Sequence, residues 1–345
     1  MAARMRMTPR FLCCALLFAA VPACVDDGTD PELGEAIDDL VVSQWPDDVT
    51  IPGKATSRPV ALTPWNGRLS MFYTDAAVSP GTEILWSWWD GASWSPSLTT
   101  GRFTTTRPAA TTFNNRLTMV YRPSGQNGLV MTSTGTLTWT APVAAGRSLA
   151  IGNYAATNPS LLEYGGKLYL AYCANNGASS YVNVDRYDGT SWAAYRQIPV
   201  SYVGSTYCQS ALIAAMPDTG EVEVIWNTVW NASNGIIYNP VYRQRGTIGR
   251  STSVWYSTET LPMKSSRPLS VVTCNGNTHL VHGGWTNDTE LWWSYRSGGA
   301  WVTDAKIPNQ WSAAGATLGC LNGTYPLMVH NVSGGTQLMQ SLFAP

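Results

Sequence analysis

The sequence predicts an all-β fold, a six-bladed β-propeller with four-stranded blades. Three observations carry this prediction: a turn-rich composition, a repeat of about 50 residues, and chain ends that complete one another. The 345 residues include 31 glycines, 21 prolines and 16 tryptophans, and only 12% are charged. Aromatic residues between turn residues are typical of short strands. The formal net charge of −1 gives no electrostatic reason to expect nucleic acid as a partner.

Each repeat reads as a strand, a tight turn of the Asn-Gly type and a second strand. The clearest copies span 57–73, 106–121, 158–172 and 266–282, and weaker copies span 210–226 and 316–330. A third strand follows, and a tryptophan then opens a fourth: Trp94, Trp139, Trp192, Trp255 and Trp301. We expect these tryptophans to pack between blades. Four strands in each repeat are typical of a propeller blade.

The sixth repeat ends after its third strand, near Leu342. It therefore lacks a fourth strand within the C-terminal part of the chain. The segment from Trp45 to Ile51 reads as that missing strand, with Trp45 at the position of the repeated tryptophan. One blade built from both ends of the chain would close the ring and remove two sheet edges.

The first 44 residues are excluded from the propeller, which we place at 45–345. Residues 1–24 combine three arginines with a short apolar run and are typical of a secretory signal peptide. The run 21–24 resembles a bacterial lipobox, which would place a lipid on Cys24 as the sole membrane contact; cleavage and full release are the alternative. Residues 25–44 read as an acidic, flexible tether. We therefore expect a secreted or cell-envelope-anchored protein.

Four cysteines remain in the propeller: Cys173, Cys208, Cys274 and Cys320. An exported chain meets an oxidising compartment, so we expect two disulfides. Three pairings are open. The cysteines lack the close spacing of zinc ligands, and we expect neither a metal nor another cofactor.

The antiparallel strands place the start of each inner strand and the end of each second strand on one face of the ring. These positions predict an axial funnel lined by Arg58, Arg107, Arg267, Tyr73, Tyr121, Tyr172, Trp226, His282, His330 and Asp75. Further candidates lie in the loops: Trp230, Trp285 and Asn287. The alternative role for the arginines is to hold neighbouring blades together through hydrogen bonds to backbone carbonyls. The alternative for the second-strand tyrosines is simply to line the channel wall.

These residue types favour a carbohydrate ligand. Aromatic rings stack on the apolar faces of sugars, and planar amide or guanidinium groups bond their hydroxyls. Three arginines around one funnel would also suit a carboxylate, as in sialic acid or a uronate. Tryptophans outside the repeat register, such as Trp65, are additional ligand candidates. The opposite face receives short turns, and we expect little chemistry there.

One blade carries a motif that resembles those of propeller lectins: Ile84-Leu85-Trp86-Ser87-Trp88-Trp89-Asp90-Gly91-Ala92-Ser93-Trp94. It resembles the blade motif of Photorhabdus-type lectins, and residues 68–72 fit the same pattern. It is also similar to the six-bladed fucose-binding lectins of the Aleuria type, which share an Asp-Gly-x-x-Trp corner. Their fucose site uses an arginine and a glutamate where this chain has Ser70 and Trp86, so the resemblance does not imply fucose specificity.

A weaker resemblance links Ser57-Arg58-Pro59 to the arginine-bearing first-blade motif of sialidase-like propellers. That resemblance implies an arginine cluster on the axis. The Asp-box that marks those enzymes does not occur in this sequence.

We expect an exported, lectin-like propeller that binds neutral or acidic glycans without catalysis. The alternative is a glycan-active enzyme, either a sialidase-like hydrolase or a uronate lyase, with an arginine-lined funnel. Asp75 is the only acid placed at the funnel, which fits a lyase better than a two-carboxylate glycosidase. A third hypothesis is a protein-interaction propeller, which would expose an apolar patch.

Overall fold

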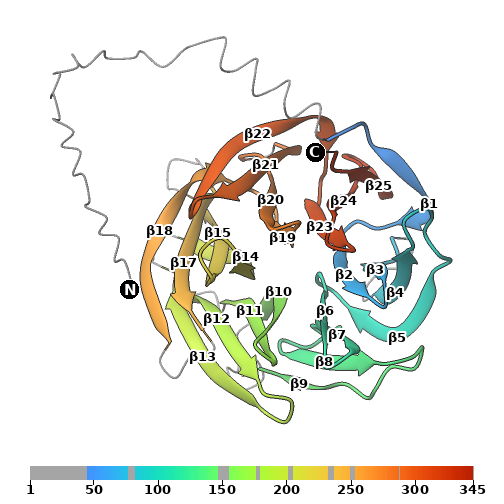
Figure 1. The fold of residues 1–345 in the computed structure, drawn as a ribbon, viewed down its shortest axis with the longest axis horizontal. Helices are drawn as coiled ribbons and strands as arrows, with labels where there is room; N and C mark the ends of the chain where they lie inside the picture. The colour runs from blue at the N-terminus through green and yellow to red at the C-terminus, as the bar shows by residue number, and fades with distance from the viewer. Residues whose placement is uncertain are drawn as a thin grey trace, which may run out of the picture.

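Six antiparallel sheets surround a central channel in the computed structural model, and each sheet is one blade (Figure 1). The structure describes residues 45–76, 82–146, 155–175, 179–200, 205–231, 237–248, 253–286 and 288–344. All regular elements within these ranges are strands, which confirms the predicted all-β propeller. No described segment forms a helix long and apolar enough to cross a lipid bilayer. The predicted signal peptide, Cys24 and the acidic tether lie outside the described residues.

The first three blades follow one another along the chain. Blade 1 consists of β2 (Ala61–Trp65), β3 (Arg68–Thr74), β4 (Thr82–Trp89) and β5 (Leu98–Thr104). Blade 2 consists of β6 (Ala109–Phe113), β7 (Arg116–Tyr121), β8 (Leu129–Thr134) and β9 (Val143–Ala145). Blade 3 consists of β10 (Ala155–Tyr164), β11 (Lys167–Asn175), β12 (Ser180–Tyr187) and β13 (Trp192–Pro199).

The remaining blades complete the ring. Blade 4 consists of β14 (Ser205–Met216), β15 (Glu221–Asn231), β17 (Pro240–Thr247) and β18 (Val254–Lys264), and a short β16 (Ile237–Tyr238) also pairs with β15. Blade 5 consists of β19 (Ser270–Cys274), β20 (Asn277–Gly283), β21 (Glu290–Ser297) and β22 (Ala300–Trp311). Blade 6 consists of β23 (Ala316–Leu321), β24 (Tyr325–Asn331), β25 (Gln337–Leu342) and β1 (Val49–Ala55).

The N-terminal strand closes the ring as predicted. In blade 6, β1 pairs antiparallel with β25, with Val49 opposite Gln340. The strand begins beyond Trp45, slightly later than the sequence pattern indicated. Trp45 itself is buried between blades 5 and 6, where its ring centre lies 5.2 Å from that of Phe343 and 6.4 Å from that of Trp293. The blade is therefore held by both strand pairing and an aromatic core.

The hydrophobic core is divided among the interfaces between neighbouring blades. Each of the six described clusters of buried side chains joins two adjacent blades. Each repeated tryptophan packs in or against the cluster that its own blade shares with the preceding blade: Trp45, Trp94, Trp139, Trp192, Trp255 and Trp301. The prediction that these tryptophans pack between blades is confirmed.

Small polar residues connect the inner strands across the same interfaces. The Leu318 amide donates to Ser270 Oγ at 2.9 Å, which joins blade 6 to blade 5. Thr317 Oγ1 donates to the Val60 carbonyl at 2.7 Å, which joins blade 6 to blade 1. Buried hydroxyls at these positions have their hydrogen bonds satisfied by the neighbouring blade, so they specify how the blades meet.

Two disulfides also join adjacent blades. Cys173 bonds to Cys208 between blades 3 and 4, and Cys274 bonds to Cys320 between blades 5 and 6. The structure thus selects one of the three pairings that the sequence left open.

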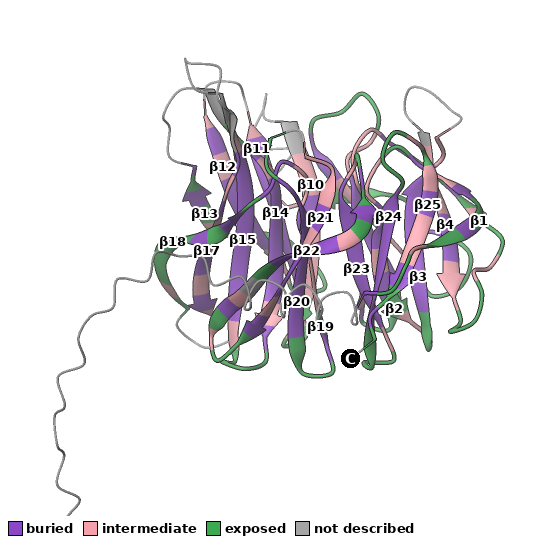
Figure 2. Ribbon diagram, turned by 90° about the horizontal axis from the view of Figure 1, so that it is seen from above, coloured by how far each residue is buried: buried purple, intermediate pink, exposed green. Residues whose placement is uncertain are grey.

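The ring has two faces that differ in chemistry. We call the face with the tight turns between inner and second strands the hairpin face; these turns lie along the lower edge of Figure 2. Asn66 and Gly67 form one such turn, with φ of 51° and 70°, backbone angles that asparagine and glycine tolerate best. The other face, where the inner strands begin, carries the predicted arginines, and we call it the arginine face.

Candidate functional site at the arginine face

The six inner strands enclose an axial channel with a volume of about 510 Å³. Its wall is largely apolar and includes Leu62, Ile213 and Leu318. Among the described lining residues, only Arg107 and Glu221 carry charge, and Arg107 belongs to the arginine face. Chemically active groups therefore gather at the ends of the channel and not along its length.

Equivalent residues of the repeat link each blade to the next at the channel mouth. Arg58 donates from Nη1 to the Thr104 carbonyl at 3.1 Å. Asn158 donates to the Gln209 carbonyl at 2.7 Å, and Gln209 donates to the Ser266 carbonyl at 2.9 Å. Gln209 and Ser266 lie at the entry to the following blade, whereas Thr104 is the last residue of β5, where the chain leaves blade 1 for blade 2. Arg58 thus bonds a backbone carbonyl at the junction of two blades, as in the alternative role for the predicted arginines.

Arg107 breaks this pattern. Its Nη1 donates to the Leu269 carbonyl at 3.0 Å, so its side chain reaches from blade 2 to blade 5 on the opposite side of the channel. Its Nε is buried without a hydrogen-bond partner in the described structure. Burial lowers the pKa of Arg107 to about 10, because a guanidinium away from water loses solvation. A bound anion would therefore stabilise the Arg107 guanidinium more than it would stabilise an arginine in water.

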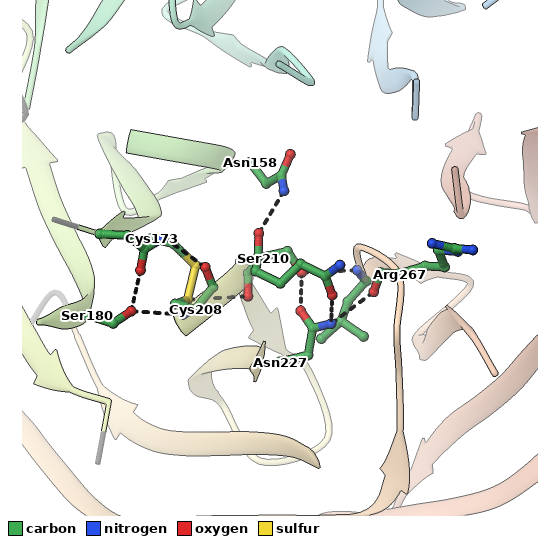
Figure 3. Close-up of a disulfide and its surroundings, with 10 residues drawn as sticks. Asn158, Cys173, Ser180, Cys208, Ser210, Asn227 and Arg267 are labelled. Atoms are coloured by element: carbon green, nitrogen blue, oxygen red, sulfur yellow. Dashed lines mark hydrogen bonds between the residues drawn. A yellow bond between two sulfur atoms is a disulfide. The ribbon is translucent and has the colours of Figure 1, made fainter. Parts of the chain in front are cut away.

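Arg267 is held by its backbone and its aliphatic stem. Its carbonyl accepts a hydrogen bond from Asn227 Nδ2 at 3.0 Å (Figure 3). Its stem packs against backbone: a Cβ at Gly283 would lie 2.5 Å from Arg267 Cγ, and a Cβ at Gly315 would lie 3.3 Å from Arg267 Cβ. Figure 3 shows its guanidinium pointing away from Ser210 and Asn227. Within the described chain, that guanidinium has neither a hydrogen-bond nor an ion-pair partner.

Arg122 is a fourth arginine of this face and was not among the predicted ligand residues. Its Nη2 donates to Thr105 Oγ1 at 3.3 Å, and its carbonyl accepts from Thr104 Oγ1 at 2.7 Å. Burial lowers the pKa of Arg122, and the nearby charge of Arg58 lowers it further. Its position directly after β7, the second strand of blade 2, had indicated that it would lie on this face.

Within the described residues, no acid neutralises the charges of these arginines. None of Arg58, Arg107, Arg122 and Arg267 forms an ion pair with an acid of the described residues. Burial also lowers the pKa of Arg58. A bound carboxylate or other anion would restore the favourable environment of the guanidinium groups and could accept their paired donors.

The predicted histidines lie behind this mouth, inside their blades. His282 Nε2 lies 2.8 Å from Asp304 Oδ1, and His330 Nε2 lies 3.0 Å from Asp48 Oδ1. Both rings are almost fully buried. Each acid follows its blade's repeated tryptophan by the same spacing, a signal that sequence reasoning missed. The two histidines thus belong to separate, equivalent pairs and do not converge on one metal.

The predicted aromatic residues are also buried between blades: Tyr73, Tyr121, Tyr172 and Trp226. The Tyr73 hydroxyl lies 2.5 Å from Ser97 Oγ, and the Tyr172 hydroxyl donates to Asp185 at 3.0 Å. Burial raises the pKa of Tyr73, and the charge of half-buried Asp75 adds to that effect. The structure places these side chains in the wall behind the arginines, and ligand contact by them stays a prediction.

The loop candidates are only partly described. Trp285 is 43% exposed, and Lys264 Nζ lies 4.3 Å from the centre of its ring. Trp230 is paired through its backbone with Thr206 and Tyr238, whereas its side chain and all of Asn287 lie outside the described residues. Within the described chain, no three His, Cys, Asp or Glu side chains are grouped to hold a metal ion.

No protein-family model and no curated protein matches the sequence. The fold is similar to that of an α-L-arabinanase from Penicillium chrysogenum, with a TM-score of 0.66 and 13% identity over 86% of this chain and 98% of that one. It is also similar to a sialidase from Trypanosoma rangeli, with a TM-score of 0.59 and 11% identity over 86% and 59%. A polysaccharide lyase, Uly1, gives a TM-score of 0.50 and 8% identity over 87% and 99%.

These similarities show that the chain shares its propeller fold with the solved sialidase and arabinanase structures. At such low identity they show the fold alone. They also correct one expectation, because the sequence motif favoured a lectin-like propeller without catalysis. The structures found are mainly glycoside hydrolases and a polysaccharide lyase. They support the alternative, a glycan-active enzyme, better than a non-catalytic lectin. The resemblance to Photorhabdus-type and Aleuria-type lectins finds no family match to support it.

Proposed function

We propose that this propeller is a glycan-active enzyme whose arginine face binds an acidic sugar. The observation that carries the proposal is the guanidinium of Arg267, which lies just before inner strand β19 on the arginine face and has no protein partner in the described structure. Arg107 brings a second, buried guanidinium toward the same segment, because its acceptor Leu269 lies two residues beyond Arg267. Unpaired arginines around one opening favour a planar anion such as a carboxylate.

The structural neighbours support a glycan as the molecule that carries this carboxylate. Sialidases and a polysaccharide lyase share the fold, and their names imply acidic sugars or polysaccharides as substrates. In such a site the arginines would bind and orient the substrate and stabilise negative charge that develops during cleavage. The charge of Asp75 acts on the buried Tyr73, and Asp75 would be the first candidate for proton transfer.

Turnover assays on the purified protein test this proposal. The substrates are sialosides, polyuronates and a neutral arabinan. We expect cleavage of an acidic substrate, with release of free sialic acid from a hydrolase or an unsaturated uronate product from a lyase. Arg267→Gln should lower kcat/KM by about 10- to 100-fold, since a hydrogen bond to a charged group contributes about 1.5–3 kcal/mol.

Arg116→Gln is the matched control. Arg116 is exposed on the hairpin face, and its Nε donates to Ser133 Oγ at 3.1 Å, so its loss removes one positive charge from a different surface. Its activity should equal that of the parent protein. Cleavage confined to arabinan, or an unchanged kcat/KM in Arg267→Gln, would contradict an acidic-sugar site. No turnover on any of the three classes would overturn the proposed enzyme.

We further propose that the protein is exported, with processing at Cys24. The two inter-blade disulfides support this proposal, because disulfides persist in oxidising compartments. The mass of the mature protein from its native host provides the test. A chain that begins at Cys24 with an added lipid would support anchoring, and an unprocessed cytoplasmic chain would contradict export.

A further inference from the structure

The hairpin face holds two cavities that the arginine-face site does not use. One has a volume of about 290 Å³ and the other about 550 Å³. Both cavities are lined by three residues from the hairpin of β2 and β3: Trp65, Asn66 and Arg68. The cavities are therefore neighbours that share one wall. The sequence analysis expected little chemistry on this face, although it named Trp65 as a ligand candidate.

Tryptophan rings form the first cavity, between blades 1 and 2. The ring centre of Trp86 lies 5.7 Å from that of Trp65 and 5.5 Å from that of Trp88. Arg68 places its guanidinium carbon 5.4 Å from the centre of the Trp88 ring. Leu137 of blade 2 completes the rim and is 65% exposed. The cavity lies at the lower end of the size range of ligand pockets, which suits one sugar ring.

Three buried polar atoms of this cavity's lining residues lack hydrogen-bond partners in the described structure. They are Trp65 Nε1, Trp86 Nε1 and Ser70 Oγ. Trp86 is 2% exposed and Ser70 is fully buried. An unpaired buried donor costs about 1–3 kcal/mol, so native proteins normally satisfy such groups. Two indole N–H groups can only donate, and the atoms that would satisfy them are oxygen acceptors.

Amide side chains surround the second cavity. Asn66, Asn115 and Asn322 come from the turns of blades 1, 2 and 6, and all three are exposed. Their backbones have φ between 51° and 57°, which fixes them as turn residues. Cys320, which also lines this cavity, is tied to blade 5 by its disulfide, so the floor is covalently braced. Amides can both donate to and accept from hydroxyl groups.

We propose that the hairpin face is a non-catalytic binding site for a neutral oligosaccharide, with Trp65 between two consecutive sugar rings. One ring occupies the tryptophan cavity, where C–H faces stack on indole and ring or hydroxyl oxygens accept the unpaired donors. The next ring meets the asparagine amides. Among the described residues that line the two cavities, only Arg68 is charged, and its guanidinium packs over Trp88. Most of the contacts on offer are therefore ring stacking and hydrogen bonds, which a neutral sugar can make.

This site is independent of the proposed enzyme activity. The arginines and the hairpin-face cavities lie on opposite faces of the ring, although Thr273 lines both the axial channel and the second cavity. Binding at the hairpin face would stand if the protein cleaved no glycan, and cleavage would stand if the hairpin face bound none.

Titration of the intact protein with neutral disaccharides tests the proposal. The probes are cellobiose, xylobiose and arabinobiose, followed by tryptophan fluorescence and by calorimetry. At least one probe should bind saturably and change the fluorescence. Trp65→Ala should weaken that binding by about tenfold or more. The reference is the stacking of a nucleobase on an aromatic side chain, which contributes about 1–3 kcal/mol. Arg267→Gln should bind the same probe as tightly as the parent protein.

Two further variants separate a binding role from a structural one. Leu137→Trp fills the tryptophan cavity from an exposed position and should abolish binding without loss of stability. Tyr256→Ala is the matched control, because Tyr256 is 44% exposed on β18 and also has an arginine, Arg245, over its ring at 5.5 Å. It should bind as the parent does. The proposal is overturned if no probe binds, or if the bound probe is unaffected by both Trp65→Ala and Leu137→Trp.

Discussion

The arginines of one face show how the same residue type performs different work at neighbouring positions of a repeat. Arg58 and Arg107 each donate a hydrogen bond to a backbone carbonyl, at 3.1 and 3.0 Å, and so partly stabilise the scaffold. Arg267 makes no such bond in the described chain, because its stem is held between Gly283 and Gly315 instead. Substitution of Arg267 therefore changes the site with the least change to the scaffold.

His279 provides a pH-dependent prediction at the residue scale. Its ring is 5% exposed, and its Nδ1 accepts from Trp293 Nε1 at 3.2 Å, so the folded protein holds it neutral. Burial lowers the pKa of His279 to about 4, from an ordinary value of 6.5. The unfolded chain takes up a proton in that interval and the folded chain does not. Stability should therefore fall by about 3 kcal/mol as the pH decreases from about 6.5 to about 4.

Urea unfolding at a series of pH values measures this loss. The control is His279→Gln, which retains an acceptor for Trp293 and does not titrate. Its free energy of unfolding should depend less on pH over the same interval. An equal pH dependence in both proteins would exclude His279 as the cause.

At the scale of single residues the sequence predicted which side chains stand on the arginine face, but not their contacts. The repeat register placed Arg58, Arg107 and Arg267 correctly at the entry to inner strands. It could not predict that Arg107 reaches Leu269, because that contact joins blades on opposite sides of the ring. The pairs of His282 with Asp304 and His330 with Asp48 were missed as well, although each acid follows a repeated tryptophan by three residues.

The closing strand is the element on which the ring depends. In β1, Ile51 is fully buried between blades 6 and 1, whereas Val49 is 58% exposed on the same strand. Ile51→Ala should lower the free energy of unfolding by about 2–5 kcal/mol, through lost burial and the cavity left behind. Val49→Ala should change it by less than about 0.5 kcal/mol. Chemical unfolding of the two variants makes the comparison, and equal losses would show that β1 does not seal that interface.

Elements of this fold were the most predictable part of the molecule. Alternation, Asn-Gly turns and the repeated tryptophan together specify four strands per blade, and β1 was found from the position of Trp45. The tryptophan cavity was not predictable in the same way. Trp65, Trp86 and Trp88 come from two strands of blade 1, and Leu137 comes from blade 2. Only the packing of one blade on the next brings them together.

The whole molecule is held by a ring of interfaces, and the disulfides cross two of them. They close chain segments with sequence separations of 35 and 46 residues. On the chain-entropy model, each should stabilise the protein by about 4 kcal/mol. Urea unfolding of Cys173→Ser/Cys208→Ser and Cys274→Ser/Cys320→Ser should show losses of that order. If a reductant leaves the stability of the parent protein unchanged, the crosslinks contribute nothing in solution.

Arg107 reaches across the axis from blade 2 to blade 5 at the arginine-face end of the channel. A solute that entered the channel from the hairpin face would meet this side chain before it reached the arginine face. Reaction products formed at the arginine face would diffuse directly into the medium, and occupancy of the opposite face would neither block their exit nor slow their release.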